Sequence, residues 1–68
     1  MIKEGKIKWF SDKKGYGFLS DDVTGADVFV HFSNIRMNGY KSLTTDQKVT
    51  YEEHKTTKGL CAKDVTAL

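Results

Sequence analysis

Apolar and polar residues alternate in short runs along most of this chain. Five such runs are rich in β-branched and aromatic residues, and their period of two places successive side chains on opposite faces of a strand. We expect strands at 5–12, 15–20, 26–32, 47–54 and 59–65. No segment keeps the 3.6-residue period of a helix, so the pattern predicts an all-β protein.

The segments between these runs contain the residue types that form turns. Short clusters rich in Asp, Gly, Lys and Thr lie at 12–15, 21–25 and 56–59. The longer connection at 33–46 is expected to hold one short helical turn, capped by Ser33 and carrying Ile35 inward. Closure into a barrel would remove the exposed edges of so small a sheet. We therefore expect a five-stranded antiparallel OB-fold barrel, while an SH3-like barrel with nearly the same strand count is the alternative that the pattern leaves open.

A core for a barrel of this size can be assembled from aliphatic side chains and one tyrosine. The positions expected to point inward are Ile7, Leu19, Val28, Val30, Ile35, Leu43, Val49, Tyr51, Ala62 and Val65. Further large rings would overfill this core, and overpacking destabilises a close-packed interior. The other aromatic residues are therefore surplus to the core.

The surplus rings lie on one face of two neighbouring strands. Tyr16 and Phe18 share a face of the second strand, and Phe29 and His31 share a face of the third. Burying the Phe29 face would also desolvate the imidazole of His31, whereas burying the opposite, valine face carries no such penalty. We expect Phe29 and His31 to point outward, with Tyr16 and Phe18 beside them where the two strands pair.

Trp9 is harder to place, because Trp9 and Phe10 are adjacent and only one of them can point inward. Strict counting from Ile7 sends Trp9 inward and Lys8 outward. Only a bulge or a strong local twist would bring Trp9 to the surface together with Lys8. The pattern alone leaves both orientations open.

The net charge of the 68-residue chain is only +2, so the distribution of charge is more informative than its sum. Five lysines lie within the first fourteen residues, opposed there by Glu4 and Asp12. An exposed patch of rings flanked by lysines suits single-stranded nucleic acid, since bases stack on the rings and phosphates attract the cations. Such stacking contributes about 1–3 kcal/mol per base.

Several other classes of protein are disfavoured. Cys61 is the only cysteine, so no intramolecular disulfide can form, and a reducing cytoplasm fits best. No apolar run resembles a signal peptide or a membrane span, and we expect a single domain over 1–68. Gly15-x-Gly17 lacks a third glycine and opens a strand, so it is not a dinucleotide motif.

Catalysis and metal binding also lack a motif. There is no P-loop and no nucleophile elbow, and His31, His54 and Cys61 do not have the paired spacing of zinc ligands. We expect no catalytic residue, no metal, no cofactor, no small-molecule substrate and no membrane partner. A barrel that grips a proline-rich peptide is the serious alternative, but lysines beside the rings favour phosphate over peptide.

The sequence resembles the bacterial cold-shock proteins at three sites, which have the order and spacing of that family's signature. Residues 8–10 read Lys-Trp-Phe, 14–18 read Lys-Gly-Tyr-Gly-Phe and 28–33 read Val-Phe-Val-His-Phe-Ser, and the match continues through 39–43. The resemblance implies an OB-fold barrel that binds single-stranded RNA and DNA with low sequence specificity. It further implies a chaperone that prevents or melts RNA secondary structure, with effects on transcription antitermination and translation in cold or stress adaptation.

The resemblance also assigns a nucleic-acid surface and places Trp9 in it. The matching positions are Lys8, Trp9, Lys14, Tyr16, Phe18, Asp27, Phe29, His31, Phe32, Tyr40 and Lys58. Three departures lie near the end of the chain: Leu60 replaces a usual proline, Cys61 a polar residue, and Asp64 a common asparagine. We expect a monomer, with a strand-exchanged dimer through the connection at 33–46 as the alternative.

Overall fold

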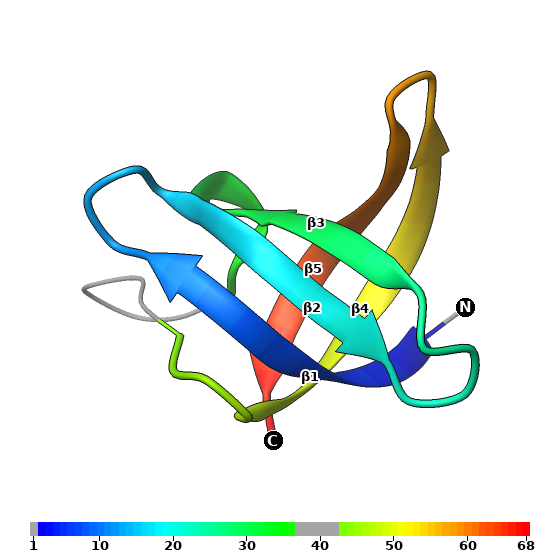
Figure 1. Ribbon diagram of the computed structural model, residues 1–68, viewed down its shortest axis with the longest axis horizontal. Coiled ribbons are helices and arrows are strands. Elements are labelled where there is room, and N and C mark those ends of the chain that lie inside the picture. The colour runs from blue at the N-terminus through cyan, green and yellow to red at the C-terminus, as the bar shows by residue number, and fades with distance from the viewer. Residues whose placement is uncertain (1, 37–42) are drawn as a thin grey trace.

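The computed structural model describes residues 2–36 and 43–68, and these form five strands and one short 3-10 turn (Figure 1). The elements are β1 (Ile2–Ser11), β2 (Tyr16–Asp21), β3 (Asp27–His31), η1 (Phe32–Asn34), β4 (Lys48–Thr56) and β5 (Gly59–Ala67). The strands close into a barrel in the order β1-β2-β3-β5-β4, in which the short contact between β3 and β5 is parallel and the other pairs are antiparallel. The predicted OB fold is confirmed, and the SH3-like alternative is wrong.

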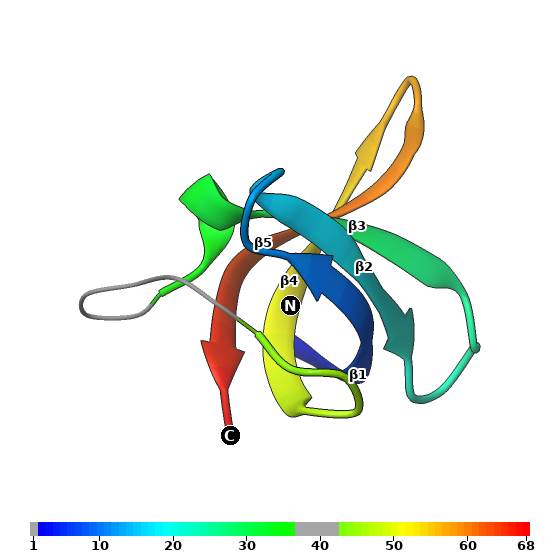
Figure 2. The same ribbon diagram turned by 60° about the vertical axis from the view of Figure 1, so that its left-hand side comes forward.

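The predicted strands are all present, with differences at their ends. β1 begins at Ile2 rather than at residue 5, because residues 2–6 pair with β4. β4 continues to Thr56 and forms a long hairpin with β5, which projects beyond the rest of the barrel (Figure 2). Residues of the projecting hairpin line a cavity together with Phe29 of β3.

The core consists of the ten positions expected from the alternation. Each of them is at most 4% exposed, and Tyr51 is fully buried among aliphatic side chains. Phe10 and Leu60 pack against the edge of this cluster. Because the aliphatic side chains fill the interior, the remaining rings are left on the outside of the barrel.

The helical turn after β3 differs from the prediction in its cap. The turn is Phe32–Asn34, and its capping residue is His31 rather than Ser33. His31 has extended backbone, and its Nδ1 lies 3.3 Å from the Ser33 amide and 2.8 Å from the Ser33 hydroxyl. Ile35 is 3% exposed, as expected, and lies just after the turn in a parallel bridge with Val65.

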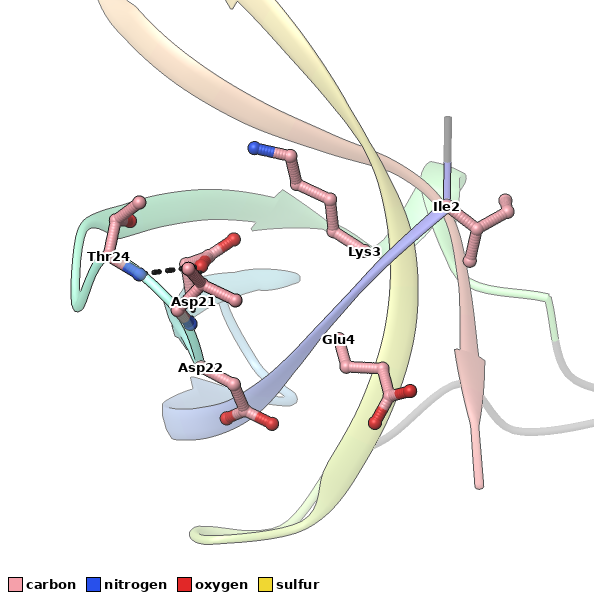
Figure 3. A pocket seen from close by; sticks show the side chains of 7 residues that line it. Ile2, Lys3, Glu4, Asp21, Asp22 and Thr24 are labelled. Atoms are coloured by element: carbon pink, nitrogen blue, oxygen red, sulfur yellow. Dashed lines mark hydrogen bonds between the residues drawn. The ribbon is translucent and has the colours of Figure 1, made fainter.

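A buried polar pair, which the sequence pattern does not reveal, ties the β2–β3 loop to the core. The Tyr51 hydroxyl donates a hydrogen bond to the Asp21 carboxylate, which is only 3% exposed. The other carboxylate oxygen accepts from the amides of Val23, at 2.8 Å, and Thr24, at 3.0 Å, as Figure 3 shows for Thr24. These three hydrogen bonds hold the pKa of Asp21 at about 2, below its ordinary value of 3.8, and the bond from Tyr51 has the largest effect.

We expect Tyr51→Phe to lower the melting temperature at pH 7 by roughly 4–8 °C, the shift that loss of one typical buried hydrogen bond produces in a domain of this size. The pKa of Asp21 is lower in the folded protein than in the unfolded chain. The ionised carboxylate therefore stabilises the fold above pH 3.8, and this stabilisation is lost as the pH falls toward 2. The difference between wild type and variant should therefore shrink between pH 4 and pH 2. Thermal melts across this range measure it, and an equal difference at all pH values would contradict the assignment.

Candidate nucleic-acid interface

Six of the described residues form one continuous group of rings on the outer face of β1, β2, β3 and η1. This ring cluster consists of Trp9, Tyr16, Phe18, Phe29, His31 and Phe32. Neighbouring ring centroids are 4.7–6.4 Å apart, and the planes are tilted or edge-on to one another. The rings therefore do not stack face to face on one another, and their faces remain available to a ligand.

The pairing of β2 with β3 places four of these rings side by side. Tyr16 lies opposite His31, and Phe18 lies opposite Phe29. All four are half-buried, whereas Trp9 is 43% and Phe32 is 47% exposed. The outward orientation predicted for Tyr16, Phe18, Phe29 and His31 is confirmed.

A bulge in β1 decides the orientation of Trp9. The register between β1 and β2 shifts between Ile7 and Trp9, so that Lys8 and Trp9 are both exposed. Ile7 before the bulge is buried, and Phe10 after it packs against the core. Trp9 thus joins the ring cluster, with its ring centroid 5.8 Å from that of Phe18.

Two glycines allow the backbone and the rings to approach each other closely. Gly17 lies opposite Phe10, and a Cβ atom on Gly17 would lie 2.1 Å from the backbone oxygen of Trp9. Gly15 has a φ of +78°, and a Cβ atom there would lie 2.9 Å from the Phe32 ring. The absence of a side chain at Gly17 therefore lets β1 and β2 approach closely at the bulge. Gly15 likewise lets the Phe32 ring lie against the turn.

Charged side chains lie at the edges of the ring cluster. Lys8 and Asp27, both assigned to the surface by resemblance, form an ion pair with a Nζ–Oδ1 distance of 3.0 Å. Their side chains are 50% and 58% exposed, so the pair contributes little to stability and either partner can be released to a ligand. Lys14 is exposed in the turn beside Gly15, and Lys58 is exposed in the turn between β4 and β5.

A cavity of about 480 Å³ separates the ring cluster from the projecting hairpin. Its lining residues are Phe18, Asp27, Phe29, Thr56, Lys58, Gly59, Leu60 and Cys61. Phe29 and Cys61 are direct neighbours in the parallel pairing of β3 with β5. The sequence pattern did not connect Cys61 and Thr56 with the rings, because this pairing joins residues 32 positions apart and leaves no local pattern.

Ten of the eleven sequence-assigned residues lie in the part of the chain that the structure describes, and Tyr40 lies outside it. The six rings, Lys8 and Asp27 form one surface, Lys14 flanks it, and Lys58 faces it across the cavity. Within residues 2–36 and 43–68, no three His, Cys, Asp or Glu side chains are grouped to hold a metal ion. The same residues contain no helix of the length and apolarity needed to cross a membrane.

Comparisons with known proteins identify the family of this chain. The family model described as "'Cold-shock' DNA-binding domain" matches residues 3–68. The chain is 52% identical over 68 residues to the cold shock-like protein of Aquifex aeolicus, covering 100% of this chain and 97% of that protein. It is 48% identical over 64 residues to the major cold shock protein of Micrococcus luteus, covering 94% of this chain and 96% of that protein.

A solved structure supports the fold independently. The structure described as "drosophila Unr CSD456" matches with a TM-score of 0.82 at 20% identity, over 100% of this chain and 27% of that chain. At this identity the match bears on the fold alone. The family match over residues 3–68, together with relatives near 50% identity over almost their full length, shows that the chain belongs to the cold-shock domain family of nucleic-acid-binding proteins.

Proposed function

We propose that this protein binds single-stranded RNA and DNA with low sequence specificity on the ring cluster. The observation that carries the proposal is the set of six neighbouring rings on the outside of a barrel whose core is complete without them. Every base has a face that can stack on an aromatic ring, so such a surface tolerates many sequences. A duplex keeps its bases stacked inside, and it would meet only the lysines.

Binding of this kind would make the protein a chaperone for RNA. A protein that binds only unpaired bases lowers the free energy of the open strand and so shifts hairpins toward melting by mass action. Melting of a terminator hairpin would favour continued transcription, and melting of a hairpin over a start site would favour translation. Several relatives are named cold shock proteins, and we propose the same setting, in the cytoplasm and as a monomer, for this chain.

The charged groups would supply a salt-dependent part of the affinity. Lys8, Lys14 and Lys58 surround the ring cluster, and each phosphate neutralised on a single strand contributes about 0.7 to the slope of log affinity against log salt. The ion pair of Lys8 with Asp27 would open as Lys8 turns to a phosphate, which leaves the Asp27 carboxylate free to accept from a base. A peptide-binding surface would show a much weaker dependence on salt.

Fluorescence of Trp9, the only tryptophan, tests the proposal directly. We expect a short thymine oligonucleotide to quench it, because Trp9 is 43% exposed within the ring cluster. Affinity should fall from low to high salt, and a duplex of the same length should quench little. Absence of quenching at micromolar concentration, or equal quenching by the duplex, would contradict a single-strand stacking surface.

A further inference from the structure

The strand pairing places one outward side chain from each of the five described strands in a single row. Trp9 pairs with Phe18, Phe18 with Phe29, Phe29 with Cys61, and Cys61 with His54. Directly paired residues share a face of a sheet, so these side chains follow one another across the outside of the barrel. The ring cluster occupies the first three positions, and the row continues beyond it over β5 and β4.

The cavity beside Phe29 supports the continuity of this row. Phe29 and Cys61 both line the cavity, so they face the same space. Thr56 also lines it, and its hydroxyl lies 3.9 Å from the Cys61 sulfur. His54 is two residues before Thr56 in β4, so the period of two puts its side chain on the same face of the hairpin as that of Thr56.

His54 is available for a ligand. The residue is exposed, and its imidazole makes no hydrogen bond, ion pair or ring contact with another residue that the structure describes. On the same face of the hairpin Glu52 lies opposite Lys63, while Lys58 lines the cavity and adds a positive charge there. The hairpin therefore carries an exposed aromatic ring and an exposed lysine, Lys58.

We propose that a bound single strand continues past Phe29, crosses Cys61 and places a further nucleotide on the imidazole of His54. This inference rests on the proposed function and extends its site onto the β4–β5 hairpin. Two strand spacings, about 10 Å, separate the β3 and β4 positions of the row, within reach of the nucleotides that follow the one on Phe29. The imidazole offers these nucleotides a flat face that accepts any base.

A length series of thymine oligonucleotides tests the extension, with Trp9 fluorescence as the readout. His54→Ala should bind the shortest oligonucleotides as the wild type does and should bind longer ones about 5-fold more weakly or worse. His54→Phe should restore the affinity for long oligonucleotides, because it keeps a ring for stacking. Equal affinities of wild type and His54→Ala at every length would overturn the proposal.

Cys61 gives a second, site-specific readout, because it is the only cysteine in the chain. A long oligonucleotide that crosses the cavity should slow alkylation of Cys61 by iodoacetamide, and one that covers only the ring cluster should protect it less. Unchanged alkylation in a complex that still quenches Trp9 would overturn the extension and leave the proposed function in place. Loss of Trp9 quenching with every oligonucleotide would instead overturn the proposed function itself.

Discussion

Phe29→Ala is expected to weaken binding of a short single strand by about 1–3 kcal/mol, roughly 5- to 150-fold in the dissociation constant, while the barrel stays folded. Phe29 lies at the centre of the ring cluster, with ring centroids of Phe18, Tyr16 and His31 at 5.6, 5.7 and 6.4 Å. The side chain is half-buried against other surface rings and contributes nothing to the core. Its loss should therefore remove a stacking platform and leave the interior intact.

Val28→Ala is the matched control, because Val28 is the neighbour of Phe29 in β3 and is fully buried in the core. It should lower the free energy of unfolding through the cavity it leaves, and the folded fraction should still bind with unchanged affinity. Thermal melts and titrations of both variants separate the two effects. Should Phe29→Ala lose as much stability as Val28→Ala with no selective loss of affinity, Phe29 would belong to the core and not to the binding surface.

The core residues and the outward orientation of the rings were predictable, because both depend on the alternation of apolar and polar residues within one strand. In β3 the period of two separates Phe29 and His31 from two valines, and the desolvation penalty of His31 decides which side is buried. The structure places the valines inside at 0% exposure and the two rings on the surface. When the two faces of a short strand differ in polarity, only one orientation of the strand buries the apolar face.

Features that depend on how one strand pairs with another were not predictable in this way. The bulge that exposes Trp9 arises from the register of β1 against β2, and alternation within β1 contains no sign of it. The hydrogen bond between Tyr51 and Asp21 joins residues thirty positions apart. The pairing of Phe29 with Cys61 belongs to the parallel contact of β3 with β5, which joins residues 32 positions apart.

The structure also accounts for two departures from the family pattern. Asp64, where asparagine is common, has a φ of +52°, in the left-handed region that asparagine and aspartate tolerate better than other non-glycine residues. Its carboxylate pairs with Arg36 at 3.0 Å. Aspartate thus keeps the backbone conformation of the position and adds a surface ion pair. Leu60, in place of proline, packs against the edge of the core and so holds the hairpin through burial.

Gly17→Ala is expected to destabilise the protein by about 3 kcal/mol or more, which in a 68-residue barrel is a large part of the total stability. A Cβ atom at this position would lie 2.1 Å from the Trp9 carbonyl oxygen and 2.7 Å from the Phe10 Cα. Both are backbone atoms of β1, so no side chain can rotate away to relieve the clash. β1 would have to move off β2 at the bulge, and Trp9 would move with it.

Gly25→Ala is the control that isolates this steric effect. Gly25 has a φ of +74°, and a Cβ atom there would meet nothing within 4 Å beyond its chain neighbours, so alanine should cost only the backbone strain, about 1–2 kcal/mol. Chemical denaturation of the two variants should therefore rank Gly17→Ala well below Gly25→Ala in stability, and any folded Gly17→Ala should show altered Trp9 emission and weaker oligonucleotide binding. A Gly17→Ala protein as stable as the wild type would contradict the close approach of β1. In the wild type, the absence of a side chain at Gly17 both lets the barrel close and holds Trp9 beside Phe18, where a base can stack on it.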